Sequence, residues 1–509
     1  MISQPPASGT DAPRTLRARR LRLHARHQVI AIMHTDCHVC RAEGLSSHSQ
    51  VLLCAGGRQV QAILFQADGD LVAPGEAALS EAAWERLGVA EGDALTVRHA
   101  PVLESLADVR RRIYGHRLDA AALAAIVGDT ASGRYTDAHL AAFLTASAAL
   151  PLDEQEIVDL TQAMIDVGER MTWDAPVVVD KHCIGGLPGN RTTPIIVAIA
   201  TANGLVMPKT SSRAITSPAG TADTMETLAP VDLDISTLRR VVESEGGCVA
   251  WGGAMHLSPA DDIFVRVERE IDLDTEGQLI ASVLSKKIAA GSNHVVLDIP
   301  VGPTAKVRTE GAARRLSDQL VAVAARFGLR ARCIRTDGSQ PVGRGIGPAL
   351  EARDILAVLQ GSRDAPADLR ERATMLAGTV LEVGGAAAKG AGHELALSTL
   401  ADGRAWTKFQ RICQAQGGMR EPPRATHVRP LTARRAGRIA FIDNRKLAQL
   451  AKLAGAPEAK AAGVLMEVVL GTEVARSQPL LQVHTETADE LTYAMDYAAR
   501  NPGIVEIVP

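Results

Sequence analysis

The spacing of hydrophobic and polar positions changes along the chain and predicts two different kinds of structure in its first third. Short β-type runs, separated by polar or glycine-containing turns, fill the segment from Thr15 to about Pro101 and include residues 29–32, 51–53 and 60–64. Within it, residues 79–97 contain Ser80 as a possible helix cap and lead into a further run at 95–97. After Pro101 the apolar period becomes 3.6 residues. One helix face is then formed by Ile157, Leu160, Met164, Val167 and Met171.

A strand, a glycine-containing loop and a helix follow one another from residue 175. The apolar run 176–180 is typical of a buried parallel strand, the loop is expected from Lys181 to Arg191, and an apolar helix from Thr192 to about Ala202. Further strands are predicted at 248–251, 295–299 and 332–334, with a helix over 312–327. This order predicts an α/β domain with a ligand site at the carboxyl end of its first strand.

The chain is therefore predicted to be a multidomain α/β protein. We expect a basic tail and β-rich N-terminal domain over 1–101, and a helical domain over 102–174 that includes parts of 255–290. A mixed α/β domain follows over 175–423. Strand-like runs at 437–442 and 503–508 predict a C-terminal α+β domain over 424–509.

Composition excludes several classes of partner. With 509 residues, a formal net charge of −3 and 3% aromatic residues, the chain lacks the basic field and stacking surfaces that hold polymeric nucleic acid. The apolar stretch 192–208 is interrupted by polar residues and is shorter than the roughly 20 residues that span a bilayer, so no membrane association is expected. Seven scattered cysteines and no secretory signal predict a cytoplasmic, reducing location.

Residues 180–186, which read Asp-Lys-His-Cys-Ile-Gly-Gly, are the strongest chemical signal. Gly185 and Gly186 would let backbone amides approach an anion, and Lys181 would add a positive charge, so this loop is predicted to bind phosphate. The segment lacks the Gly-Lys-Ser/Thr ending of a P-loop. An ordinary strand-to-helix turn with Lys181 and His182 on the surface is the alternative.

A second polar cluster spans 209–223 and is rich in hydroxyls, with one arginine and a Gly-Thr turn. Its hydroxyls could orient phosphate oxygens, while Arg213 could brace the loop or bind an acid. The alternative is a polar connection in which Asp223 and Glu226 begin a helix.

Together these two segments resemble the signature of the thymidine phosphorylase and pyrimidine nucleoside phosphorylase family. Residues 257–262, 282–287, 298–302 and 336–344 also resemble family blocks in the same order. The additional N-terminal domain and the segment 211–217 are similar to the AMP phosphorylase branch and to long bacterial members.

The resemblance implies roles for individual positions. Phosphate would be bound by Lys181, Gly185, Gly186, Thr193, Ser211, Ser212 and Thr221. His182 would act beside the nucleobase, and Asp274 matches the proton donor of the AMP-cleaving branch. Nucleoside or nucleotide contacts would come from Arg213, Thr216, Ser217, Ser282, Lys286 and Lys306. Ser282 and Lys286 lie one helical turn apart, so both could face the cleft from the helical, base-binding side.

Two positions depart from the family pattern. Cys183 stands where the family usually has serine, which replaces a hydroxyl by a weakly donating thiol. The arginine that contacts the base aligns to either Arg266 or Arg269. The glycine-rich stretch 384–392 is either a hinge, a cleft-lining loop or a plain surface loop.

Cys37 and Cys40 form a Cys-X-X-Cys pair near His34 and His38. Without a second pair at ligand spacing, incidental thiols are favoured over a zinc or redox site, and no metal is expected.

The resemblance implies a pentosyltransferase that splits a pyrimidine nucleoside or deoxynucleoside with inorganic phosphate, without a cofactor. It also implies a homodimer or higher homo-oligomer. AMP phosphorylase, which yields ribose 1,5-bisphosphate, is the alternative within enzymes. A non-catalytic nucleotide- or metal-binding protein is the alternative of another class.

Overall fold

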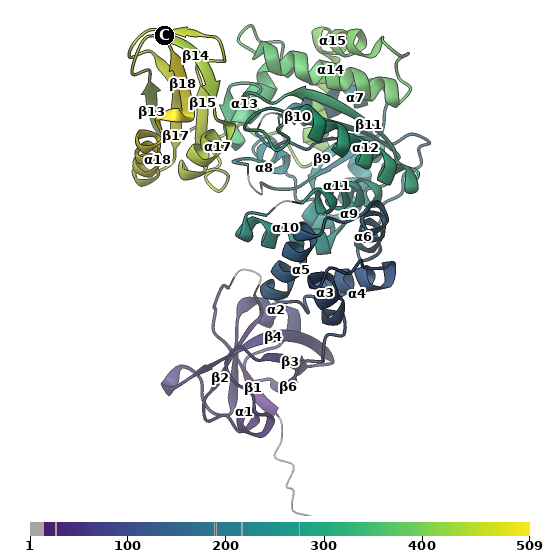
Figure 1. Cartoon of the computed structure of the whole chain (residues 1–509), viewed down its shortest axis with the longest axis vertical. Coiled ribbons are helices and arrows are strands. Elements are labelled where there is room, and N and C mark those ends of the chain that lie inside the picture. Colours follow the sequence, from purple (N-terminus) through teal and green to yellow (C-terminus); the bar gives the residue numbers. More distant parts are fainter. Residues whose placement is uncertain (1–14, 26–27, 188, 190, 215–216, 274) are drawn as a thin grey trace, which may run out of the picture. The chain divides into compact units, whose positions relative to one another are not determined.

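The computed structural model describes residues 15–25, 28–187, 189, 191–214, 217–273 and 275–509. These residues belong to two compact units. The first comprises the chain up to Leu106 together with Ser132–Thr136, and the second comprises residues 107–131 and 137–509. Figure 1 labels many of the helices and strands of both.

The first unit is built on a closed six-stranded barrel. Its strands lie in the order β1 (Thr15–Arg20), β5 (Glu76–Leu79), β2 (Ile30–His34), β4 (Arg58–Ala67), β3 (Gln50–Ala55) and β6 (Ala94–His99). In β3, Val51 and Leu53 are buried and alternate with partly exposed neighbours, as in a strand with one face on a core. Two short helices, α1 (His38–Glu43) and α2 (Glu81–Leu87), complete the unit. The predicted β-rich character and the Ser80 cap are confirmed, since Ser80 Oγ accepts a hydrogen bond from the backbone N–H of Ala83.

Helices dominate the chain between the barrel and residue 166. They are α3 (Leu106–Ile113), α4 (Ala120–Ala131), α5 (Asp137–Ala149) and α6 (Glu154–Asp166). Helices α10 (Pro259–Ile271) and α11 (Glu276–Ala289), which come much later in the sequence, pack against α4, α5 and α6. A capping box formed by Asp153 and Glu156 begins α6.

The predicted apolar face of α6 is correct at its start and wrong at its end. Ile157, Leu160 and Met164 are buried, but Val167 is already the C-terminal cap and Met171 lies beyond the helix. At Gly168 a Cβ atom would lie 2.1 Å from the carbonyl oxygen of Leu257. The two backbones therefore approach so closely here that the position has no room for a side chain.

A parallel sheet in the order β11 (Arg330–Asp337), β10 (His294–Val301), β7 (Val179–Cys183) forms the centre of the α/β region. A second parallel pair joins β8 (Met207–Ser211) to β9 (Gly247–Trp251). The helices α7 (Thr192–Ala202), α12 (Glu310–Arg326), α13 (Pro348–Leu359), α14 (Ala367–Val383), α15 (Gly392–Ala401) and α16 (Arg404–Ala415) belong to the same region. Residues 195–200 of α7 are completely buried and belong to its main apolar core.

The first strand of this region lies later in the sequence than predicted. We expected a strand over 176–180 followed by a loop from Lys181, whereas Lys181, His182 and Cys183 are the last three residues of β7. Parallel pairing with β10 extends as far as Cys183 opposite Asp298, while Val178 makes only an isolated bridge to Val206. Pairing with β10 therefore places residues 181–183 in a strand, although their polar sequence had predicted a loop.

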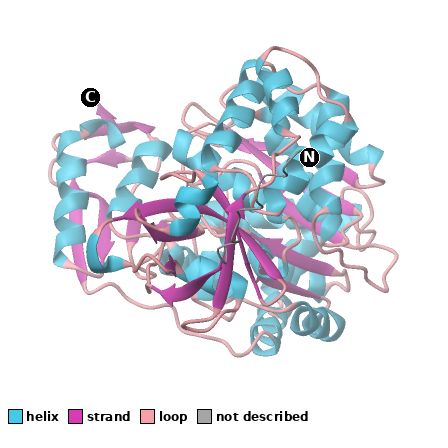
Figure 2. Ribbon diagram, turned by 90° about the horizontal axis from the view of Figure 1, so that it is seen from below, coloured by secondary structure: helices cyan, strands magenta, loops and turns pink. Residues whose placement is uncertain are grey.

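The C-terminal region contains two antiparallel sheets and two long helices. One sheet has the order β12 (Gly345–Ile346), β15 (Gly463–Met466), β17 (Pro479–Thr485), β13 (His427–Thr432), and the other the order β16 (Glu473–Val474), β14 (Gly437–Ile442), β18 (Val505–Val508). The helices α17 (Asn444–Leu453) and α18 (Ala488–Arg500) pack on each other beside these strands (Figure 2). The predicted strands at 437–442 and 503–508 correspond to β14 and β18. Among the described residues, no helix combines the length and the apolar character needed to cross a membrane.

Candidate active site

A pocket opens in the second unit at the carboxyl ends of β7, β8 and β9, the edge of an α/β structure at which ligands usually bind. Helices α10 and α11 also contribute side chains to it. Its lining residues are His182, Thr210, Ser211, Ser212, Gly252, Gly253, Leu257, Ser258, Asp262, Val283, Lys286 and Lys287. Four predicted site residues, His182, Ser211, Ser212 and Lys286, therefore meet in one pocket.

Two buried lysines next to the pocket share one buried carboxylate. Lys209 Nζ lies 3.1 Å from Asp180 Oδ1, and Lys287 Nζ lies 2.9 Å from Asp180 Oδ2. Burial lowers the pKa of Lys209 well below its ordinary value, and repulsion from Lys287 adds to this. The pKa of Asp180 is lowered because the two lysines outweigh the opposing effect of its burial. When both lysines are protonated, their charges exceed that of the one carboxylate, and an anion in the pocket would stabilise that state.

His182 is held neutral by the same surroundings. Burial lowers the pKa of its imidazole well below the ordinary value, and the charges of Lys287, Lys209, Lys286 and Lys181 lower it further. A neutral imidazole has one N–H donor and one acceptor nitrogen, so His182 can hydrogen-bond a nucleobase edge without carrying a charge.

Lys181 is fully buried and does not line the pocket. Its Nζ donates a hydrogen bond to Thr192 Oγ1 at 2.8 Å and lies 3.8 Å from Asp298 Oδ2. The neighbouring thiol of Cys183 has its pKa raised to about 12 by burial and by the charge of Asp298. Cys183 is therefore a neutral thiol at neutral pH. This agrees with the prediction that it is a weak hydrogen-bond donor.

The glycine turn after β7 needs its glycines for two different reasons. Gly186 has a φ of +61°, a conformation that favours glycine. A Cβ atom on Gly185 would lie 2.8 Å from Cδ of Pro300, so that position has no room for a side chain. Thr193, the other phosphate-binding candidate near this turn, is buried at the second position of α7 and does not line the pocket.

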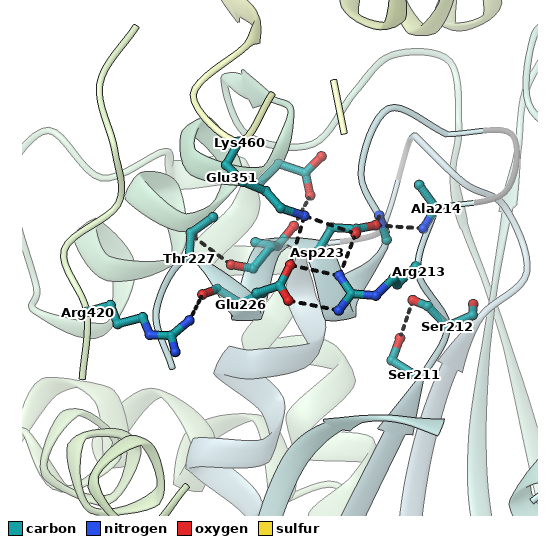
Figure 3. Close-up of polar contacts among 12 residues, drawn as sticks. Ser211, Ser212, Arg213, Ala214, Asp223, Glu226, Thr227, Glu351, Arg420 and Lys460 are labelled. Carbon is teal, nitrogen blue, oxygen red and sulfur yellow. Dashed lines mark hydrogen bonds and ion pairs between the residues drawn. The ribbon is translucent and has the colours of Figure 1, made fainter. Parts of the chain in front are cut away.

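Arg213, which follows β8, is used to brace its own loop (Figure 3). Its guanidinium donates two hydrogen bonds to Glu226, at 2.7 and 2.8 Å, and its Cζ lies 4.8 Å from the ring centre of Trp251. Of the two roles considered for this residue, bracing is the one that its contacts show. Among the described residues of this loop, Ser211 and Ser212 line the pocket.

The side of the pocket formed by α10 and α11 contains an ion pair between a buried aspartate and a partly exposed lysine. Lys286 Nζ lies 2.5 Å from Asp261 Oδ2, and the pKa of Lys286 stays raised because Asp261 and Asp262 outweigh the effect of burial. Ser282, one turn earlier on α11, is buried at 9% exposure and is not a lining residue. Asp262 lines the pocket from an exposed position in α10, and partial desolvation of its carboxyl raises its pKa to about 6.

The remaining nucleotide-binding candidates are spread over several segments. Ser217 donates a hydrogen bond to the carbonyl oxygen of Ala219 at 2.9 Å, and Thr221 begins the short helix α8 (Thr221–Glu226). Lys306 follows β10 and does not line the pocket. Asp274 and Thr216 lie outside the described residues.

Neither candidate arginine reaches the pocket. Arg266 is paired with Asp137 of α5 at 2.7 Å, and Arg269 is exposed in the last turn of α10. The glycine-rich stretch 384–392 connects α14 to α15 and contributes no lining residue either. In it, the backbone N–H groups of Gly390 and Gly392 donate to Glu382 Oε1.

Cys37 and Cys40 are both buried in the first unit and are hydrogen-bonded to each other. This bond lowers the pKa of Cys37 to about 6 and raises that of Cys40. Within the described ranges, no three histidine, cysteine or acidic side chains gather as a metal site would require.

Among the residues at or beside the pocket that had no assigned role from the sequence are four charged ones: Asp180, Lys209, Asp262 and Lys287. A signal was present for two of them. Asp180 ends an apolar run just before Lys181, and Lys287 follows Lys286 on a largely buried helix. A charged residue in a buried segment is seldom unpaired, so an oppositely charged partner could have been predicted for each of these two residues.

Comparison with known proteins agrees with this architecture. Residues 175–406 match the α/β domain of a glycosyl transferase family, and residues 109–168 match the helical bundle domain of that family. The chain is 73% identical to a protein of Chelativorans sp. over 98% of each chain, and 66% identical to one of Tolumonas auensis over 97% of this chain and 98% of the other. Both relatives are named "Putative thymidine phosphorylase".

A solved structure with a similar fold is anthranilate phosphoribosyltransferase from Thermus thermophilus. It has a TM-score of 0.51 at 19% identity, over 60% of this chain and 98% of that one. The similarity covers the fold alone.

The family matches and the relatives of nearly full length, together with a ligand pocket where an α/β sheet meets a helical bundle, show that this chain is a pentosyltransferase of the thymidine phosphorylase family.

Proposed function

We propose that the protein catalyses the reversible phosphorolysis of a pyrimidine nucleoside or deoxynucleoside, giving the free base and the pentose 1-phosphate. Inorganic phosphate is the second substrate and no cofactor takes part. The observation that carries the proposal is the pocket itself. It is lined by the neutral His182, by Lys286, and by Lys287, which shares Asp180 with Lys209.

The reaction needs an anion held in line with a glycosidic bond. A phosphate oxygen attacks the anomeric carbon, and the bonding electrons leave with the base nitrogen through a transition state of oxocarbenium character. Neither partner is strongly reactive, so positioning and electrostatics supply most of the rate. A phosphate would favour the protonated form of the two lysines on Asp180, and Ser211 and Ser212 are hydroxyl donors at the same pocket.

The departing base acquires electron density on its ring oxygens and nitrogens. Lys286 keeps its charge through Asp261 and can stabilise that density, while His182 contributes hydrogen bonds. Lys181 acts indirectly in this scheme, because its Nζ donates to Thr192 at the start of α7 and so orders the glycine turn.

Protonation of the base requires an acid that still holds its proton near neutral pH. The neutral His182 is a poor source, and Asp274, at the position of the donor in the AMP-cleaving branch, is the candidate that the resemblance implies. Asp262 is a second carboxyl suited to this role, since it lines the pocket and has a pKa of about 6.

The proposal includes a cytoplasmic homodimer. In support of a reducing compartment, all seven cysteines are free thiols. The assembly rests on family resemblance.

A panel of thymidine, uridine, cytidine and AMP with excess phosphate, read as free base released, tests the proposal. Base released from a pyrimidine nucleoside only when phosphate is present supports it. Release from AMP alone would instead indicate the AMP phosphorylase reaction, which requires a second phosphate site.

A further inference from the structure

A cluster of four charged side chains joins the loop after β8 to the C-terminal region (Figure 3). Lys460, between α17 and β15, places its Nζ 2.8 Å from Glu226 Oε2 and 3.5 Å from Asp223 Oδ1. On the other side, Arg213 contacts the same two acids, at 2.7 Å from Glu226 and 3.4 Å from Asp223. Two cations thus face two carboxylates that both belong to α8.

The backbone around Lys460 is fixed. Its carbonyl oxygen accepts a hydrogen bond from the N–H of Ala349 in α13, and the N–H of Ala461 donates to Glu486 Oε1 at 2.9 Å. Exposed lysine pairs usually contribute little, because a long side chain loses entropy when it is held. Here backbone hydrogen bonds already fix the main chain of Lys460 beside the acids, so less entropy is lost when its side chain forms the ion pairs.

Asp223 is the link to the loop itself. Its Oδ2 accepts hydrogen bonds from the backbone N–H groups of Ala214 at 2.6 Å and Gly220 at 3.0 Å, and its side chain is only 3% exposed. One carboxylate therefore holds both ends of the segment between Ala214 and Gly220. A Cβ atom on Gly220 would lie 2.6 Å from the carbonyl oxygen of Ser212, so the two ends lie against each other.

The charge balance of the cluster depends on Lys460. Hydrogen bonding to Arg213, with a further contribution from Lys460, lowers the pKa of Glu226 to about 2, so this acid is ionised at any working pH. Without Lys460, Arg213 alone would face two carboxylates, and one negative charge would remain uncompensated beside a loop expected to bind phosphate. That charge would repel the anion and would draw Arg213 and Asp223 out of their present geometry.

We propose that Lys460 is a positioning residue that ties the C-terminal region to residues 211–214 and 220–221 of the loop after β8 and so sets the affinity for phosphate. The inference rests on the phosphate-binding role proposed for that loop. It assigns the C-terminal region a part in the reaction although none of its residues lines the pocket.

The test compares Lys460→Met, Lys460→Arg and the control Lys446→Met in the full-length chain. Lys446 is also a partly exposed lysine of the C-terminal region, but it is paired locally with Asp443 at 3.5 Å. Inorganic phosphate binding is measured by calorimetry without nucleoside, and the phosphate KM, nucleoside KM and kcat by base release. We expect Lys460→Met to weaken phosphate binding and raise the phosphate KM about three- to fivefold, as loss of one partly exposed ion pair allows. Nucleoside KM and kcat should stay within about twofold under the same reasoning.

Two further results separate positioning from general destabilisation. Lys460→Arg, which keeps the charge, should restore phosphate binding, and so should Lys460→Met combined with Glu226→Gln, which restores the balance of charge. Unchanged phosphate affinity in Lys460→Met, or an equal loss in Lys446→Met, overturns the inference. If the wild type binds phosphate in a Lys460-dependent way but releases no base, the proposed reaction fails and the role of Lys460 stands. If the wild type binds no phosphate, both fail.

Discussion

The ammonium nitrogen of Lys287 lies 2.9 Å from Oδ2 of Asp180, and the two side chains are 4% and 0% exposed. Lys209 occupies the other oxygen of the same carboxylate at 3.1 Å. This arrangement places the pocket-lining Lys287 in a buried group in which two lysines share one carboxylate. Burial is the main cause of the lowered pKa of His182, and the two lysines lower that pKa further.

Replacing Asp180 by Asn should strongly destabilise the protein. The change leaves Lys209 and Lys287 buried without a counter-charge, and breaking a buried pair in this way costs about 3 to 5 kcal/mol. The free energy of unfolding, measured by urea titration, checks this. Asp159→Asn is the control, because Asp159 makes only an exposed hydrogen bond to Gln155. Equal unfolding free energies for the two variants would show that Asp180 does not hold the lysines.

Lys181→Met and His182→Ala should impair different steps. Lys181→Met removes the hydrogen bond to Thr192 and the charge near the glycine turn, so the KM for phosphate should rise about tenfold while kcat changes less. His182→Ala removes a hydrogen-bonding group from the pocket and should lower kcat by about a hundredfold, with a smaller change in the KM for phosphate. Steady-state kinetics at varied phosphate separates the effects. Unchanged phosphate dependence in Lys181→Met would reject the role given to that residue.

Cys183→Ser should tighten phosphate binding. The thiol is protonated at neutral pH because its pKa is raised to about 12, so it is only a weak hydrogen-bond donor, and a hydroxyl donates better. Cys183 does not line the pocket, so the expectation rests on the resemblance, which implies a phosphate-facing hydroxyl at this position; on that basis the KM for phosphate should fall about two- to fivefold. A higher KM in this variant would mean that the thiol serves packing rather than phosphate binding.

The pH dependence should contain a limb from Asp262 and none from His182. A carboxyl of pKa about 6 that donates a proton is active below that value, so the rate should fall as the pH rises through 6. The imidazole of His182 does not titrate in this range because its pKa is lowered well below the ordinary value. We expect the limb in the pH profile of kcat to disappear in Asp262→Asn. Its persistence would assign the ionisation to another acid, with Asp274 the first to examine.

Local patterns in the sequence were sufficient where an element is defined by its own residues. The apolar run that predicts a helix from Thr192 to about Ala202 corresponds to α7, and the runs at 437–442 and 503–508 correspond to strands. The glycines at 185 and 186 predicted a turn open to a phosphate; Gly185 has no room for a Cβ atom and Gly186 has a φ of +61°, while phosphate binding stays a prediction.

Features that depend on distant partners could not be derived in the same way. The end of β7 is set by pairing with β10, more than a hundred residues later, which places His182 in a strand rather than in a loop. The second lysine on Asp180 and the contact of Lys460 with Asp223, 237 residues away, belong to tertiary packing. Local periodicity carries no information about such pairs.

Release of free base from thymidine and uridine, measured by chromatography with and without inorganic phosphate, tests the central claim most directly. The account predicts release only with phosphate, together with an equal amount of pentose 1-phosphate, and a strong loss of release in His182→Ala. Base release at the same rate without phosphate, or none from any nucleoside or from AMP by folded protein, would contradict it.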